Sequence, residues 1–178
     1  MKVVVFDYLG SIDPDSVGAV MDVGTWQAQP GIADAIAHLN HHGWHVVQAV
    51  NQPGLGRGRL EMAELTAVQQ RLQTILNAAG GRIEAFFFCP HAPEEHCDCR
   101  KPAPGLLLQI AARCGVAPQE LWVVGLCQAH IQAGLAVGAK VALVMPDPSL
   151  HIDCTLCAES PLPRYANWMA LAHALAPD

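Results

Sequence analysis

A cluster of cysteine and histidine residues offers the most specific chemistry in the chain. Residues 89–99 read CPHAPEEHCDC, and this segment holds four candidate ligands with the spacing C-x-H-x5-C-x-C: Cys89, His91, Cys97 and Cys99. Three thiolates and one imidazole suit tetrahedral structural zinc, and four protein ligands leave no position for a catalytic water. The two prolines restrict the loop and lower the entropy lost when the ligands converge. We therefore predict a structural zinc site in a zinc-binding loop over residues 89–99.

Alternatives to this ligand set stay open. The cysteines could be unligated loop residues, and His96 competes with His91 as the fourth ligand. A second group with the spacing H-x2-C-x2-C supplies only three candidate ligands: His151, Cys154 and Cys157. Because a closed zinc site needs four ligands, free thiols or a packing role are favoured there over a second metal.

Composition limits the classes of protein that can carry this site. The 178 residues suit one domain, which we expect to span 1–178. The formal net charge of −6 disfavours nucleic acid as a partner, and no apolar run is long enough for a membrane span. The first seven residues, MKVVVFD, lack the features of an export signal, and seven cysteines, an odd number, suit a reducing compartment. We expect a cytoplasmic protein without nucleic-acid or membrane partners.

The elements that must position the site alternate along the chain. Short apolar or β-branched runs predict strands at 3–6, 44–50, 83–88, 121–124 and 140–144. Helical spacing of apolar residues predicts helices at 32–39, 60–76, 106–112 and 131–137, with a closing helix at 168–176. Residues 146–163 contain four prolines without a clear period and predict an irregular excursion. This alternation predicts an α/β fold, a doubly wound parallel sheet between two helix layers.

Ligands of such sheets bind beyond the carboxyl ends of the strands. The residues that follow the predicted strands are Asp7, Asn51, Cys89 and Gly125. The zinc-binding loop is therefore an insertion at the same edge of the sheet as Asp7.

Several motifs, taken in order, resemble one family. The cysteine and histidine spacing followed by RKPAPG at 100–105 resembles the zinc loop and basic signature of the D-glycero-D-manno-heptose 1,7-bisphosphate phosphatases. These belong to the haloacid dehalogenase (HAD) superfamily, alongside the histidinol-phosphate phosphatases. Further matches are FD at 6–7, NQPGLGRG at 51–58, VVG at 123–125 and QAG at 132–134. The likeness covers residues 1–145 and implies a HAD-like Rossmannoid fold.

The resemblance implies phosphoryl transfer to an aspartate, followed by hydrolysis, with magnesium bridging enzyme and phosphate. Asp7 matches the nucleophile and Lys101 matches the lysine that stabilises the phosphate charge. Arg100 matches a substrate-contacting arginine, and a phosphate could still be held by Arg100, Lys101 and the backbone amides near Asn51 and Gln52. The implied phosphate-binding set is therefore Asn51, Gln52, Arg100 and Lys101.

The chain departs from the family at the positions that drive the reaction. Leu9 stands where the resemblance places the acid/base aspartate, and Val50 replaces a hydroxyl residue. Leu126 and His130 replace both carboxylates of the metal loop. Loss of general acid catalysis alone lowers a rate typically about 10²- to 10⁴-fold, and magnesium requires hard oxygen ligands. We therefore do not expect tight magnesium binding, and we expect the phosphatase activity to be lower by many orders of magnitude.

Three outcomes for the altered crevice are considered. Leu9, Val50 and Leu126 could pack together and fill it with apolar surface, which is the favoured interpretation. Two other outcomes keep chemistry in the crevice. A loop carboxylate could swing inward, the candidates being Asp13 and Asp15, or a softer metal could bind to Cys127 and His130.

The favoured function is a zinc-binding HAD-like protein with lost or severely reduced phosphatase activity, a pseudoenzyme with a binding or assembly role. Its ligand would be a small phosphorylated molecule or a protein partner. The alternative is an active phosphomonoesterase of the heptose-bisphosphate or histidinol-phosphate type that uses Asp7 with an altered metal site. A structural subunit without any ligand is a third hypothesis.

Overall fold

A parallel sheet forms the centre of the molecule. The computed structural model describes residues 1–8, 12–13, 19–20, 24, 26–145 and 162–177. Within these residues the sheet has the order β5-β4-β1-β6-β7-β8, and every neighbouring pair is parallel. Its strands are β1 (Lys2–Phe6), β4 (Trp44–Asn51), β5 (Ala85–Cys89), β6 (Trp122–Gly125), β7 (Lys140–Val144) and β8 (Arg164–Tyr165). A separate antiparallel pair consists of β2 (Ile12–Asp13) and β3 (Ala19–Val20).

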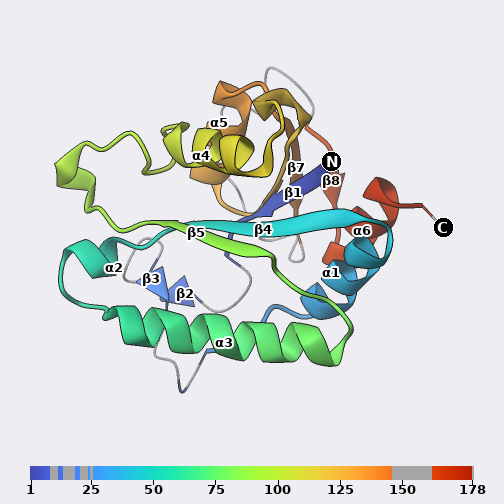
Figure 1. Cartoon of the computed structure of the whole chain (residues 1–178), viewed down its shortest axis with the longest axis horizontal. Helices are drawn as coiled ribbons and strands as arrows, with labels where there is room; N and C mark the ends of the chain where they lie inside the picture. Colours follow the sequence, from blue (N-terminus) through green and yellow to red (C-terminus); the bar gives the residue numbers. More distant parts are fainter. Residues whose placement is uncertain (9–11, 14–18, 21–23, 25, 146–161, 178) are drawn as a thin grey trace.

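Helices cover both faces of the sheet, as Figure 1 shows. On one face lie α1 (Ile32–His41), α3 (Met62–Ala78) and α6 (Trp168–Leu175), whose apolar residues share a core with one side of the strands. On the other face lie α4 (Gly105–Cys114) and α5 (Gln128–Ala136), which bury a second core. The short α2 (Pro53–Gly56) follows β4. The predicted doubly wound α/β fold is confirmed.

The predicted elements differ from the observed ones mainly at their ends. The strand predicted at 83–88 runs over Ala85–Cys89, and the helix predicted from residue 60 begins at Met62. Glu61 caps that helix, since its backbone N–H donates to the Glu64 carboxylate while its own side chain accepts from the Glu64 backbone. The sequence did not predict β2, β3 or β8, because two-residue strands are too short to show a period. Residues 146–161 of the predicted excursion lie outside the described residues.

The order of the strands defines where a ligand crevice belongs. From β1 the chain adds β4 and β5 on one side of the sheet and then β6 and β7 on the other. The carboxyl ends of β1 and β6 therefore flank the topological switch point, where ligands of open α/β sheets bind. Asp7 follows β1 and Leu126 follows β6.

No helix in the described part of the chain has the length and apolar character that crossing a membrane requires. The cytoplasmic location and the absence of nucleic-acid partners stay predictions.

Candidate functional site

A buried ion pair lies at the switch point. The Lys101 ammonium and the Asp7 carboxylate are 1% and 2% exposed, and Lys101 Nζ lies 2.6 Å from Asp7 Oδ1. The same ammonium donates to the backbone oxygen of Ala49 at 2.6 Å and contacts His130 Nδ1 at 3.0 Å. A lysine ammonium has three N–H groups. All three are therefore engaged within the protein.

Asn51, at the end of β4, holds Lys101 in place. Its amide oxygen accepts from the Lys101 backbone N–H at 3.0 Å, and its amide nitrogen donates to the Lys101 carbonyl at 2.9 Å. The Tyr8 hydroxyl donates to the Asn51 carbonyl at 2.6 Å, and the Tyr8 ring lies 5.7 Å from Lys101 Nζ. These contacts join the ends of β1 and β4 to the segment that follows the zinc-binding loop.

The contacts of His130 determine its tautomer. Because the Lys101 ammonium can only donate, His130 Nδ1 must accept, so the ring proton lies on Nε2. That nitrogen lies 3.2 Å from the Val5 carbonyl, to which it donates. The side chain is fully buried in the first turn of α5. Since both ring nitrogens have protein partners, His130 has none left for a softer metal.

Burial keeps the neighbouring titratable groups neutral. It lowers the pKa of His130 to about 4, and the charge of Lys101 adds to this effect. Burial, together with the charge of Asp7, raises the pKa values of Tyr8 and Cys127. The site at neutral pH therefore combines one ion pair with a neutral histidine, phenol and thiol.

This histidine should make stability depend on pH. The folded chain protonates His130 near pH 4, whereas an unfolded histidine protonates near pH 6.5. The unfolded state thus binds more protons between these values, and the free energy of unfolding should fall by about 3 kcal/mol as pH drops from about 6.5 to about 4. Urea unfolding at a series of pH values checks this.

His130→Asn is the matched control, since its amide can accept a hydrogen bond but does not titrate in this range. It should lose that part of the pH dependence, whereas the zinc-binding loop and the acidic residues act equally in both chains. Identical pH profiles for the two chains would show that His130 is not the group responsible.

A small cavity opens beside the ion pair. It has a volume of about 180 Å³ and is lined by Asp7, Tyr8, Leu126 and Cys127. Asp7 Oδ2 is buried and has no hydrogen-bond partner among the described residues. Asp7 supplies the only carboxylate among these four lining residues, while magnesium prefers six oxygen ligands in near-octahedral geometry. The described residues therefore do not fit a magnesium site.

The residues expected to bind phosphate are largely engaged elsewhere. The Gln52 backbone N–H donates to the Cys89 carbonyl at 2.8 Å, and its side-chain oxygen is buried without a partner among the described residues. Arg100 is partly buried and donates to the His91 carbonyl at 3.4 Å. Of the expected set, Arg100 alone retains an unburied charge.

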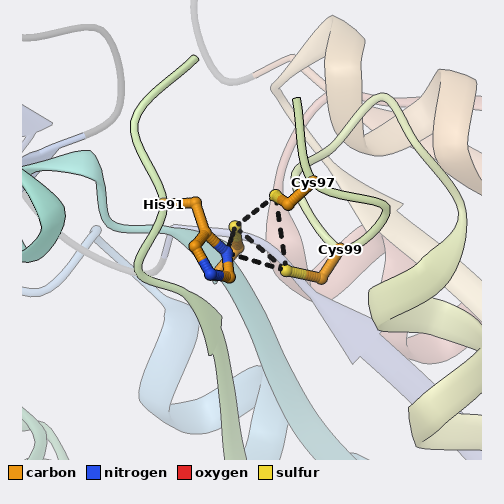
Figure 2. Close-up of side chains that lie close together, drawn as sticks. His91, Cys97 and Cys99 are labelled. Carbon is orange, nitrogen blue, oxygen red and sulfur yellow. Dashed lines mark hydrogen bonds between the residues drawn. The ribbon is translucent and has the colours of Figure 1, made fainter. Parts of the chain in front are cut away.

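The four predicted zinc ligands converge on one point. The ligand atoms of Cys89, His91, Cys97 and Cys99 lie within 4.8 Å of one another, the one such group of acidic, cysteine and histidine side chains in the described residues. Figure 2 shows His91 Nδ1 facing the sulfur atoms, 3.2 Å from Cys99 Sγ. The sulfur atoms are 3.3 to 3.5 Å apart. Tetrahedral zinc with bonds of about 2.3 Å would place them roughly 3.8 Å apart, so the cluster fits zinc after a small expansion.

Local contacts hold the loop in this shape. The Glu95 carboxylate accepts from the Ala92 backbone N–H at 2.6 Å, and His96 turns the chain with a φ of 49°. Gly105 approaches Asp98, which lies between two ligands, so closely that a Cβ there would clash with the Asp98 carbonyl. Burial of Cys89, followed by its hydrogen bond with Cys99, raises the pKa of its thiol to about 12. A metal must therefore displace protons when it binds.

Other candidate ligands lie elsewhere. His96 is exposed and is not a member of the cluster, whereas His91 is. The second cysteine and histidine group at 151–157, and Leu9 and Asp15, lie outside the described residues. The backbone of Asp13 belongs to β2. Val50 is buried. Leu126 is half-buried and packs against the core on the α1 side of the sheet.

The strand order, with an aspartate after β1 and a buried lysine beside it, defines a HAD-like fold. A HAD-like phosphatase from Mesorhizobium loti shares this fold, with a TM-score of 0.75 at 23% identity over all of this chain and 88% of its own. D,D-heptose 1,7-bisphosphate phosphatase from B. bronchiseptica, solved with magnesium and phosphate, matches with a TM-score of 0.83 at 32% identity over 98% of both chains.

Sequence relatives identify the family. The D-glycero-beta-D-manno-heptose-1,7-bisphosphate 7-phosphatase of Pseudomonas putida is 40% identical over 144 residues, which is 81% of this chain and 82% of the relative. That of Neisseria meningitidis serogroup A is 37% identical over 145 residues, 82% of this chain and 78% of the relative. No protein-family model matches the chain. The chain belongs to the family of D-glycero-beta-D-manno-heptose-1,7-bisphosphate 7-phosphatases.

Sequence reasoning missed two members of the site. It treated His130 only as a lost carboxylate or a ligand of a softer metal, whereas the structure makes it an acceptor for Lys101. It did not consider Tyr8, which joins Asn51 to the crevice. Tyr8 could have been identified from its position, because it is a polar residue directly after Asp7 and the ends of the strands form the crevice.

Proposed function

We propose that this chain is a zinc-binding HAD-like protein whose phosphatase activity is lost or severely reduced, and which acts by binding rather than by catalysis. The carrying observation is the closed network around Lys101. Its three N–H groups bind Asp7, Ala49 and His130, so none is available to a phosphoryl group without rearrangement.

The chemistry of the family supports this proposal. Attack by Asp7 on a phosphate needs a cation between two anionic groups, a proton donor for the leaving oxygen, and a charge that stabilises the transferring group. Asp7 offers one oxygen that is not engaged by Lys101, and Leu126 supplies no ligand to a cation. Without these groups the nucleophile and phosphate repel each other.

Zinc has a structural role in this proposal. Cys89, His91, Cys97 and Cys99 would hold it with all four positions filled by protein. Bound there, it stabilises the loop that leads into Arg100 and Lys101.

The proposed binding role retains a phosphorylated small molecule as a candidate ligand. Arg100 would attract its phosphate, and the other expected phosphate-binding residues are Asn51, Gln52 and Lys101, of which Asn51 and Lys101 are hydrogen-bonded to each other. A protein partner is the other candidate. Neither nucleic acid nor a membrane is proposed.

An active phosphomonoesterase stays the second candidate function, because its relatives at 37 to 40% identity are named as phosphatases. Asp7 is also in the position of their expected nucleophile. Under this alternative, the proton donor and the metal ligands that the crevice lacks would have to come from residues outside the described ranges.

Phosphate release separates the two functions. With heptose 1,7-bisphosphate, histidinol phosphate and magnesium, the natural chain should release phosphate at least about 10⁴-fold more slowly than the P. putida relative assayed beside it. Any residual rate should be the same in Asp7→Asn. Rapid magnesium-dependent release that Asp7→Asn abolishes would overturn the proposal in favour of the phosphatase.

A further inference from the structure

The sulfur atoms of the cysteine and histidine cluster are close enough for chemistry besides metal binding. Cys97 Sγ lies 3.5 Å from the sulfur atoms of both Cys89 and Cys99, and those two atoms are 3.3 Å apart. Figure 2 shows these contacts as a closed set. A disulfide bond joins two sulfur atoms at about 2.04 Å, so each pair is within about 1.5 Å of bonding distance. A small movement of the loop can therefore join any two of them.

Cys97 is the cluster cysteine that a dissolved molecule reaches most easily. Cys89 is fully buried at the end of β5, and Cys99, although half-buried, packs against the core that α4 and α5 share with the sheet. Cys97 is half-buried, lies beside the exposed His96 and Asp98, and belongs to neither core of the described residues. An oxidant in solution therefore meets Cys97 first.

Zinc bound to the cluster would keep Cys97 in its nucleophilic form. Cysteine binds zinc as a thiolate, and the thiolate is also the form that reacts with peroxides. Redox-sensitive cysteines combine thiolate character with exposure and with a neighbouring thiol that resolves the first oxidation product. Cys97 meets these conditions, because Cys89 and Cys99 both lie beside it. In the described part of the chain, the other free cysteines lie outside the cluster: Cys114 and Cys127.

We propose that Cys97 is a peroxide-sensitive modification site, and that its oxidation releases zinc from the loop. The Cys97 thiolate attacks one oxygen of hydrogen peroxide, so an S–O bond forms, the O–O bond breaks and the leaving hydroxide takes up a proton. The thiolate of Cys89 or Cys99 then attacks the Cys97 sulfenic acid, forms the S–S bond and displaces a second hydroxide, which becomes water. Two electrons pass from two sulfur atoms to the peroxide, and the charge of the zinc ion does not change.

The disulfide leaves too few ligands for zinc and alters the contacts of Arg100. A structural zinc site needs four protein ligands, and only His91 and one thiolate of the cluster remain after oxidation. Arg100 directly follows Cys99 and donates to the His91 carbonyl at 3.4 Å, so both partners of this contact adjoin the zinc site. Oxidation therefore frees the Arg100 guanidinium, the group that the proposed function assigns to phosphate. This inference rests on the zinc site of the proposed function.

The test treats the zinc-loaded natural chain with hydrogen peroxide beside a colorimetric zinc chelator. We expect one zinc ion to be released for every two thiols lost, whereas the same chain without peroxide should keep its zinc. Peptide mass mapping should find Cys97 in a disulfide with Cys89 or Cys99. The amide NMR signal of Arg100 should shift as the thiols are lost. A reductant with added zinc should restore the thiols, the metal and this signal.

Two variants supply the matched protein controls. Cys97→His keeps a zinc ligand at this position but removes the thiolate. After its zinc content is checked, it should release zinc at least about tenfold more slowly than the natural chain at the same peroxide concentration. The second variant keeps only the cluster thiols and should release zinc as fast as the natural chain. It carries serine at the four other cysteine positions, which are Cys114, Cys127, Cys154 and Cys157.

Three results would overturn the inference: zinc release without loss of thiols, disulfides that leave out Cys97, or release from zinc-loaded Cys97→His at the natural rate. If Cys97→His binds no zinc, the disulfide map of the natural chain decides. The proposed zinc site fails separately, by a natural chain that contains no zinc before peroxide is added. A chain that keeps both its zinc and its cluster thiols in peroxide would contradict this inference alone.

Discussion

A chain with aspartates restored at positions 9, 126 and 130 is expected to release phosphate from heptose 1,7-bisphosphate at least about 10³-fold faster than the natural chain. Leu9→Asp would supply the missing general acid, a group worth typically about 10²- to 10⁴-fold. Leu126→Asp would add a carboxylate to the wall of the cavity that Asp7 lines. The gain should require magnesium, because the added oxygens are the ligands which that ion prefers.

The third substitution follows from the structure. His130 accepts a hydrogen bond from Lys101 and so engages one of its three N–H groups. His130→Asp would replace the neutral ring with a carboxylate of the kind the family uses for metal. A chain that carries only Leu9→Asp and Leu126→Asp should therefore gain less activity than the chain with all three substitutions.

Matched amides test whether charge is responsible. Asparagine at the same three positions has nearly the same size but neither donates a proton as an acid nor offers a carboxylate to metal. This chain should stay inactive, and Asp7→Asn in the restored chain should abolish the gain. A natural chain as active as the restored one would refute the interpretation of the crevice.

The sequence predicted the sheet because each buried strand is a short apolar run. Val3, Val4 and Val5 are fully buried, as expected for a central parallel strand covered on both faces. The convergence of the four cysteine and histidine side chains was predictable for a different reason, since four candidate ligands within eleven residues have little freedom to lie apart. In both cases the decisive information is local.

The network in the crevice depends on contacts that no local pattern contains. Lys101 and Asp7 are separated by 94 positions, and His130 reaches Val5 across 125. The sequence predicted that the crevice would lack metal ligands, but not that a lysine would direct all three of its donors to protein acceptors. That result follows from the precise placement of Ala49 and His130, which only the folded chain provides.

Loss of the cysteine and histidine cluster, the proposed zinc site, should have the largest effect on stability. Protein purified without chelator is expected to contain one zinc per chain, measured by elemental analysis. Cys97→Ser removes one of four ligands and should abolish stoichiometric zinc, because apparent binding energies of structural zinc are of order 10 kcal/mol at pH 7. The thermal midpoint should fall, since binding to the folded chain alone stabilises it.

Cys114→Ser is the control for the loss of a thiol. Cys114 lies at the end of α4, is free and half-buried, and is not a member of the cluster. This variant should keep one zinc and a thermal midpoint near that of the natural chain. Because each ligand must lose its proton, zinc affinity should also weaken as pH falls. Zinc-free natural protein, or full zinc content in Cys97→Ser, would show that the four residues are not a zinc site.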